Sequence, residues 1–451
     1  MNLKIKNFSK IEGTVKAPSS KSYSHRAVII ASLAKGTSKL YDVLYSEDVL
    51  ASINACKSLG AKITEKEDEI GTYLEVIGTD GCLHNQSEDF IDLANSGTTL
   101  RIMTSVASLS DNEITFTGDD SLKTRPMGPL LEALDSLGVK TTSLNNNEKA
   151  PLTIKPGFKG GNVSILGNMS SQFISSILIS SPLSDDGVEL CVLPKFVSKP
   201  YVDMTISVME KFGVNIKHIE QNNNSNNTNN NSNNNQDNES QFDTKFIIPT
   251  QKYNSTNYTV EGDYSSASYL LATCAIAGGE ITVQNLFKDS KQGDKLIIDI
   301  LKNMGCEIDI CDSYVTIKSD GNLNSVSEIN LANAPDLLLT VAILAAVANG
   351  ETKITGIGHA RLKETDRIDT TCRELEKLGC ELQEFEDYMI IKGKTIHGGV
   401  VKSHKDHRLA MAFSLLGLKY DVEVEDGECF DVSFPNFIDA MAKIGVELEL
   451  I

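Results

Sequence analysis

Six copies of one sequence pattern run along the chain, and this repeat limits the possible folds more than any other feature. In each copy an amphipathic run ends at a glycine, and a short apolar run follows. The copies are INACKSLGAKI, LEALDSLGVKT, ISVMEKFGVNI, IDILKNMGCEI, CRELEKLGCEL and IDAMAKIGVEL, with Gly60, Gly138, Gly213, Gly305, Gly379 and Gly445. A glycine here is typical of a left-handed helix end, so each copy predicts a helix followed by a strand. The recurrence indicates one supersecondary unit repeated six times.

One spacing between these glycines is longer than the others. Gly213 and Gly305 are 92 residues apart, whereas the other steps are 66 to 78 residues. The longer step contains NNNSNNTNNNSNNN, within residues 221–240. This tract has no apolar side chain to bury, so it predicts a disordered surface insertion.

A second, nearly apolar helix is expected in each copy. The six runs are SHRAVIIASLA, GTTLRIMTSVASL, SQFISSILISS, SSASYLLATCAIA, DLLLTVAILAAVA and DHRLAMAFSLLGL. Each begins with Ser, Thr, Asp or Gly, which are residues that cap helix N-termini. Helices that are apolar all round are buried, so these six should form the centres of the domains.

Polar and cationic side chains gather at the N-termini of these buried helices. They are Lys21, Arg26, Arg101, Gln172, His407 and Arg408. Capping does not explain them, because a cation at a helix N-terminus opposes the helix dipole. An anion shared with the backbone N–H groups does explain them. If the helices of two domains converge, the cleft between them is a strong site for several anions.

Composition restricts the other possibilities. A net charge of −19 disfavours nucleic-acid binding. A length of 451 residues suggests two or three domains. The expected protein has no membrane span and no secretory signal. Nine cysteines without a Cys-x-x-Cys pair indicate buried thiols in a reducing cytoplasm, with zinc binding or disulfides as the alternatives.

Several short motifs carry groups suited to acid–base chemistry or ligand binding. The run PSSKSYSHR lacks the spacing of a nucleotide P-loop. NMSSQF and SKPYVD supply hydroxyl, amide and phenol groups for a polyhydroxy ligand. GHARLKETDR places Lys363, Glu364 and Arg367 together, and APDLLLT places Asp336 at the head of a buried helix. A solvated charge run is the alternative, but a desolvated carboxylate among cations is poised for proton transfer.

The ordered set of motifs resembles one enzyme family. PSSKSYSHRA, LANSGTTLR, SSQF, SKPY, EGDYSSASYLLA, RLKETDR and DHRLAMA are similar to motifs of the 5-enolpyruvylshikimate-3-phosphate synthases, from about residue 3 to 450. The resemblance implies a two-domain inside-out α/β barrel of six βαβαββ repeats, three per domain. Residues 1–16 and 261–451 would form one domain, and residues 17–260 the other, including the insertion.

The resemblance also implies a reaction and its residues. The enolpyruvyl group of phosphoenolpyruvate would pass to the 5-hydroxyl of shikimate 3-phosphate through a tetrahedral intermediate, without metal or organic cofactor. Asp336 would accept the hydroxyl proton, Glu364 would protonate the vinyl carbon, and Lys21 would touch both substrates. The implied shikimate 3-phosphate contacts are Lys21, Ser22, Arg26, Ser170, Ser171, Gln172, Ser198, Tyr201, Asp336 and Lys363. The implied phosphoenolpyruvate contacts are Lys21, Gly97, Arg125, Gln172, Arg367 and Arg408.

Two departures and two rival interpretations accompany this resemblance. Val432 stands where many members have a lysine before S-F-P, and His359 aligns with an asparagine contact of some members. UDP-N-acetylglucosamine enolpyruvyl transferases share the fold and chemistry, but they have Lys-Asn in place of Lys21-Ser22 and a reactive mid-chain cysteine. A catalytically inactive paralogue acting as a binding module is the other rival. We expect a cytoplasmic monomer that binds two small anions.

Overall fold

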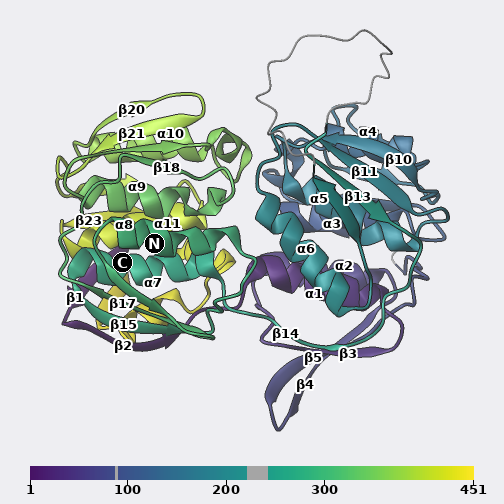
Figure 1. The fold of residues 1–451 in the computed structure, drawn as a ribbon, viewed down its shortest axis with the longest axis horizontal. Coiled ribbons are helices and arrows are strands. Elements are labelled where there is room, and N and C mark those ends of the chain that lie inside the picture. The colour runs from purple at the N-terminus through teal and green to yellow at the C-terminus, as the bar shows by residue number, and fades with distance from the viewer. Residues whose placement is uncertain (87–89, 221–241) are drawn as a thin grey trace, which may run out of the picture.

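The computed structural model describes residues 1–86, 90–220 and 242–451. The predicted insertion at 221–240 therefore lies outside the described residues. Figure 1 shows two lobes side by side, one coloured purple to teal and the other mainly green to yellow, with both chain termini in the second. No helix among the described residues is long and apolar enough to cross a membrane.

Each lobe is built from three copies of one βαβαββ unit, and the third copy shows its plan. It consists of β10 (Gly161–Leu166), α5 (Ser171–Ser180), β11 (Val188–Leu193), α6 (Lys199–Lys211), β12 (Lys217–Glu220) and β13 (Thr244–Ile248). β10 pairs parallel with β11, and β13 lies antiparallel between β11 and β12. All six four-stranded sheets have this strand arrangement, as the repeated pattern predicts.

The remaining elements complete the other five units. In the first lobe they are α1 (Lys21–Leu33), β3 (Thr37–Tyr41), α2 (Glu47–Ser58), β4 (Lys62–Asp68), β5 (Gly71–Ile77), β6 (Ile91–Asp92), α3 (Gly97–Ala107), β7 (Ile114–Thr117), α4 (Gly128–Ser136), β8 (Thr141–Ser143), β9 (Leu152–Ile154) and β14 (Asn257–Thr259). In the second they are β1 (Leu3–Phe8), β2 (Ile11–Lys16), α7 (Tyr264–Ala277), β15 (Gly279–Gln284), α8 (Ile297–Asn303), β16 (Glu307–Ile310), β17 (Tyr314–Ser319), β18 (Glu328–Asn330), α9 (Leu338–Val347), β19 (Glu351–Thr355), α10 (Arg367–Lys377), β20 (Glu381–Glu384), β21 (Tyr388–Lys392), β22 (Gly399–Lys402), α11 (His407–Ser414), β23 (Val422–Glu425), α12 (Phe437–Ala442) and β24 (Val446–Leu450).

Three sheets take one strand from a distant part of the chain. β2 pairs parallel with β15, and β1 lies between β23 and β24. β14 pairs parallel with β3. The chain thus passes between lobes twice, and its buried apolar residues form two separate cores. From this we propose domains of residues 1–16 plus 261–451 and of residues 17–260.

The repeat glycines adopt the backbone conformation that the pattern predicts. All six have φ between 81° and 107°, a region that side chains with a β-carbon rarely adopt. The helices before them end two or three residues earlier: α2, α4, α6, α8, α10 and α12. Local backbone chemistry therefore sets the boundary between helix and strand in every unit.

The first helix of each unit is buried, as its apolar sequence predicts. α1, α3 and α5 lie within one lobe, and α7, α9 and α11 within the other. Five of them start with a capping serine or aspartate whose side chain accepts from the first turn. α9 differs from the expectation, because a 3₁₀ turn over Pro335–Leu337 precedes it and Leu337 provides no side-chain cap. Asp336 lies in that turn, where it makes contacts outside the helix.

Candidate active site

A pocket between the two lobes collects the N-terminal ends of the buried helices. It has a volume of about 1010 Å³ when measured out to its open mouth. One side comes from the starts of α1, α3, α5 and α6, and the other from the turn before α9, residues 359–364, and the starts of α10 and α11. The site residues expected from the sequence all line it: Lys21, Ser22, Arg26, Gly97, Arg125, Ser170, Ser171, Gln172, Ser198, Tyr201, Asp336, Lys363, Glu364, Arg367 and Arg408.

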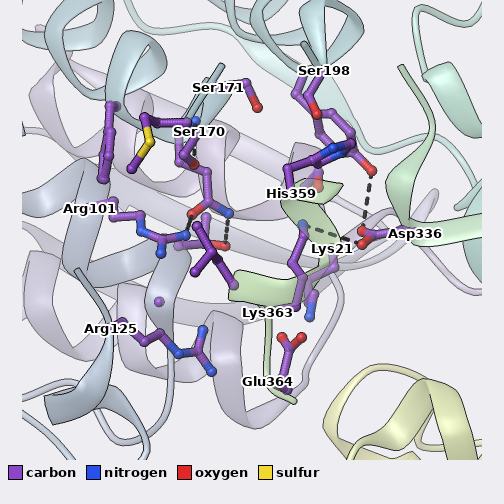
Figure 2. Close-up of a pocket in the computed structure, with 18 of the residues that line it drawn as sticks. Lys21, Arg101, Arg125, Ser170, Ser171, Ser198, Asp336, His359, Lys363 and Glu364 are labelled. Atoms are coloured by element: carbon purple, nitrogen blue, oxygen red, sulfur yellow. Dashed lines mark hydrogen bonds and ion pairs between the residues drawn. The ribbon is translucent and has the colours of Figure 1, made fainter. Parts of the chain in front are cut away.

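Positive charge dominates this pocket although the whole chain is acidic. Its basic side chains are Lys21, Arg26, Arg101, Arg125, Lys363, Arg367 and Arg408. Three carboxylates line it too: Asp48, Asp336 and Glu364. Figure 2 shows Arg101 and Arg125 on one wall and Asp336 and Glu364 opposite, with Lys21 and Lys363 between them. Such a cleft attracts small anions and concentrates them near the carboxylates.

Asp336 lies at the centre of a cluster of cations. Its Oδ2 is 3.0 Å from Arg408 Nη2, and its Oδ1 is 3.1 Å from Arg367 Nη1 and 3.5 Å from Lys363 Nζ. Burial alone would raise the pKa of Asp336, but these cations outweigh it and hold the pKa well below its usual range. Asp336 is therefore ionised and able to accept a proton.

Glu364 shares the guanidinium of Arg367 with Asp336. Its Oε2 is 2.5 Å from Arg367 Nη2. Burial acts to raise the pKa of Glu364, yet Arg367 and Arg125 lower it well below its usual range. Arg367 is 1% exposed and also binds Asp406, with 2.8 Å between Nε and Oδ2, so its position is fixed.

Lys21 reaches the pocket from the first turn of α1. Its Nζ forms an ion pair of 2.8 Å with Oδ2 of Asp48, at the start of α2. Burial opposes the ionisation of Asp48, but Lys21 lowers the pKa of this carboxyl below its usual value. The pair therefore holds the ammonium group of Lys21 at one place in the pocket.

Arg26 lies deeper than Lys21, one turn along the same helix, and is 1% exposed. Its guanidinium donates to Thr205 Oγ1 at 2.7 Å and to the carbonyl of Ser22 at 2.8 Å. It also donates to the carbonyl of Tyr201 at 3.0 Å. None of these three acceptors is charged, so no carboxylate neutralises the guanidinium of Arg26 through them. Its positive charge remains available to an anion in the pocket. Burial lowers the pKa of Arg26 to about 10.

The opposite wall holds Arg101 and Arg125. Arg101 Nη1 donates to Gln172 Oε1 at 2.6 Å, and Gln172 Nε2 donates to Thr98 Oγ1 at 2.9 Å. Arg125 lies against Gly97 so closely that a β-carbon on Gly97 would be 2.3 Å from Arg125 Nη1. The absence of a side chain at Gly97 thus determines where the guanidinium of Arg125 can lie.

Hydroxyl groups and one imidazole complete the lining. Ser170, Ser171 and Ser198 lie along one edge of the pocket. Tyr201 lies at the same edge and contacts the second lobe. The backbone N–H of Ser198 donates to the carbonyl of Ala332 at 3.0 Å, which ties the lobes together beside the pocket. Burial lowers the pKa of His359 to about 4, so this side chain is neutral at pH 7.

Sequence reasoning missed some residues of the site. Asp48 and Thr98 line the pocket without being marked by a motif, and the sequence marks Arg101 only as a cation at a helix start. Asp294, which accepts from Tyr201, lies in KQGDKL, a run that reads as an ordinary charged loop. No local signal marks these residues, because they join the site only through folding. Val432 is not among the residues that line the pocket.

Comparisons with known proteins agree on one family. Residues 5–441 match the family model described as EPSP synthase (3-phosphoshikimate 1-carboxyvinyltransferase). The 3-phosphoshikimate 1-carboxyvinyltransferases of Methanobrevibacter smithii and Methanothermobacter thermautotrophicus are 64% and 48% identical, each over 100% of both chains. The structure of EPSP synthase from Acinetobacter baumannii has a TM-score of 0.77 at 26% identity, covering 100% of this chain and 99% of that one.

Proposed function

The chain belongs to the EPSP synthase family, and on that premise we propose that the pocket between its lobes binds phosphoenolpyruvate and shikimate 3-phosphate together. Enzymes of this family transfer the carboxyvinyl group of the first to the second in the shikimate pathway, and this chain is such a transferase. We further propose that the acceptor is the 5-hydroxyl and that a tetrahedral intermediate is formed and then loses phosphate.

The single observation that carries the proposal is a cationic pocket that holds the carboxylates Asp336 and Glu364. Both substrates carry a phosphate and a carboxylate. Backbone N–H groups at helix starts and fixed guanidinium groups are the usual protein partners of such anions. Asp336 and Glu364 then provide groups for the two proton transfers that the reaction requires.

The substrates would share the pocket between two partly overlapping sets of residues. For shikimate 3-phosphate the proposed contacts are Lys21, Ser22, Arg26, Ser170, Ser171, Gln172, Ser198, Tyr201, Asp336 and Lys363. For phosphoenolpyruvate they are Lys21, Gly97, Arg125, Gln172, Arg367 and Arg408. The serines and Tyr201 support the first set because they suit a polyhydroxy ring. The guanidinium groups support the second because they bind carboxylate and phosphate in two-pronged geometry.

Asp336 would take the proton from the substrate hydroxyl. A carboxylate with a low pKa is a weak base, and Arg408, Arg367 and Lys363 make it weaker. Anionic substrates bound to those cations offset part of their charge, which raises the pKa of Asp336 toward that of an ordinary carboxyl. Binding thus makes the base stronger in the complex in which it acts.

Glu364 would deliver a proton to the vinyl carbon of phosphoenolpyruvate. The same logic applies, because Arg367 and Arg125 keep it ionised in the empty pocket. Substrate anions on these arginines favour protonation of Glu364, so the proton donor forms only when phosphoenolpyruvate is present. Lys21 is held in place by Asp48. Its ammonium group would stabilise the combined negative charge of the two bound substrates.

Phosphate release on mixing the two substrates tests this function. The enzyme should release phosphate with shikimate 3-phosphate and phosphoenolpyruvate, and not with UDP-N-acetylglucosamine and phosphoenolpyruvate. Release only with the UDP-sugar would favour the sister transferase activity, and no release with either acceptor would favour an inactive binding protein.

We propose no metal or organic cofactor, since the carboxylates and cations supply the acid, the base and the charge stabilisation. We also propose that the enzyme acts as a cytoplasmic monomer. Support for the compartment comes from nine cysteines, all unpaired in the structure. Support for the monomer comes from the pocket, because a single chain supplies both of its walls.

A further inference from the structure

The phenol of Tyr201 connects two carboxyl groups of the opposite lobe. Tyr201 lies on α6, and its Oη is 2.9 Å from Asp294 Oδ2 and 3.2 Å from Asp336 Oδ2. A phenol has one proton and can donate it to one carboxylate at a time. The second contact is therefore favourable only when a carboxyl group also carries a proton. The three side chains form a path along which one proton can move.

Asp294 is placed to hold that proton. It is 3% exposed, and its Oδ1 has no hydrogen-bond partner among the described residues. The charged groups that face it from the neighbouring elements are Asp336, Asp263 and Arg408, and Lys21 lines the same small hollow. Burial and the negative charges of Asp336 and Asp263 disfavour ionised Asp294, and Arg408 opposes them only in part.

The two carboxyl groups at the ends of this path differ in acidity. Burial, and then the charge of Asp336, raise the pKa of Asp294 to about 7. The pKa of Asp336 is held well below its usual range by its three cations. A proton shared by the pair therefore resides on Asp294, on the side away from the main pocket.

We propose that Asp294 holds, for part of each turnover, the proton that Asp336 removes from the substrate hydroxyl, with Tyr201 as the link. This inference rests on the role of Asp336 proposed above. Asp294 touches no substrate in this scheme, so it is a positioning residue that acts through Tyr201.

The transfer conserves atoms and charge. Asp336 takes the hydroxyl proton on a carboxylate oxygen and passes one proton to Tyr201 Oη, while the original phenol proton moves to Asp294 Oδ2. The two steps are concerted, because burial raises the pKa of Tyr201 well above its usual value and a free phenolate would be costly. The overall reaction places the hydroxyl proton on the released phosphate, so the proton returns along the same path when phosphate departs.

The pH dependence of kcat with both substrates saturating tests the proposal. In the unmodified enzyme kcat should fall on the acid side with an apparent pKa near 7, because protonated Asp294 cannot accept a second proton. Asp294→Asn should lower kcat at pH 8 by roughly 10- to 100-fold, in the lower range for acid–base groups, and should remove this acid limb. Tyr201→Phe should do the same, and the double variant should be no slower than the slower single variant.

Asp299→Asn, an exposed carboxylate on neighbouring α8, is the matched control and should keep the unmodified profile. An acid limb near 7 that persists in Asp294→Asn, or losses that multiply in the double variant, would overturn the inference. If Asp294→Asn does not fold, Tyr201→Phe provides the test instead: an acid-side fall of kcat near pH 7 that persists in Tyr201→Phe would also overturn the inference. Asp336→Asn distinguishes the proposed base from the proposed proton path. Near-normal turnover of Asp336→Asn refutes the role of Asp336 as the base. A large loss of turnover in Asp336→Asn, with normal turnover in Asp294→Asn, refutes only the proton path.

Discussion

Arg367 and Glu364 form an ion pair with 2.5 Å between Nη2 and Oε2, and the same guanidinium contacts Asp336 at 3.1 Å. One arginine therefore favours the ionised form of both carboxylates on which the proposed chemistry depends, together with Arg408 and Lys363 at Asp336. An anion bound at Arg367 offsets its positive charge and so raises the pKa of both carboxylates. Substrate binding is therefore coupled to the ability of these two groups to exchange protons.

The first prediction concerns Glu364→Gln. The amide keeps the shape of the side chain but has no acid proton to transfer. We expect kcat to fall by roughly 10²- to 10⁴-fold, as for loss of a general acid, while the Kd for shikimate 3-phosphate changes little. Steady-state kinetics and calorimetric binding measure the two quantities. Glu376→Gln, at an exposed position on α10, the helix that follows Glu364, is the control. Near-normal turnover of Glu364→Gln would mean that the proton donor is another group.

The second prediction concerns Lys21→Met, which removes an ammonium group proposed to touch both anions. Binding and turnover should fall together, because the charge acts on the substrates and on the transition state alike. We expect kcat/KM to decrease by at least about 10²-fold, with a weaker Kd for each substrate. Lys57→Met, at an exposed position on α2, is the control. A loss confined to kcat, with both Kd values intact, would contradict the proposed contact.

The third prediction uses the close approach of Gly97 and Arg125. A methyl group at position 97 would overlap Arg125 Nη1, which the new β-carbon would approach to 2.3 Å. The flexible guanidinium should move, so Gly97→Ala should raise the KM for phosphoenolpyruvate by about tenfold, the effect of losing about 1.4 kcal/mol of binding. The Kd for shikimate 3-phosphate should stay within about twofold. Equal weakening of both substrates would show that Arg125 does not distinguish between them.

The fourth prediction concerns the glycine that ends α8. Gly305 has a φ of +107°, and a β-carbon there would meet only Asn324 Nδ2, at 3.5 Å. Gly305→Ala should therefore destabilise the fold through backbone strain alone, by about 1–2 kcal/mol. Thermal unfolding measures the effect, and Lys302→Ala on the same helix should change stability by less than about 0.5 kcal/mol. An unchanged Tm for Gly305→Ala would refute the strain argument.

The fifth prediction concerns pH and the buried His25. Burial lowers the pKa of His25 to about 3, while Nδ1 lies 2.8 Å from Ser52 Oγ. The unfolded chain, with an ordinary histidine pKa near 6.5, binds more protons than the folded chain between about pH 3 and 6.5. Stability is therefore lost as the pH falls below 6.5. Between pH 7.5 and 5.5 the unmodified protein should lose about 1.4 kcal/mol more than His25→Gln does.

The measurement for this prediction is Tm at the two pH values. His84→Gln, at an exposed position, should follow the unmodified protein. Parallel pH profiles of the unmodified protein and His25→Gln would mean that His25 is protonated in the fold or is not desolvated.

The architecture could be predicted from the sequence because its signals are local. A glycine such as Gly138 ends a helix through its own backbone freedom, and an all-apolar run such as that of α9 has to be buried wherever it lies. Each of the six units repeats these signals, so the number and the order of the units could be predicted from the sequence. The cap expected at α9 was the exception, because a 3₁₀ turn replaced it there.

The chemistry of the site was only partly accessible in this way. The sequence determined which side chains stand at the helix starts, and the ordered motifs identified the family and hence the residues around the pocket. The tertiary structure decided which groups contact one another: Asp48 with Lys21, Tyr201 with Asp294, and Arg367 with both carboxylates. Asp294 shows the reason most clearly, since its partner Tyr201 is 93 residues away in the chain. Its pKa depends on burial and on charges a few ångströms away in space, and neither quantity can be read from neighbouring residues in the chain.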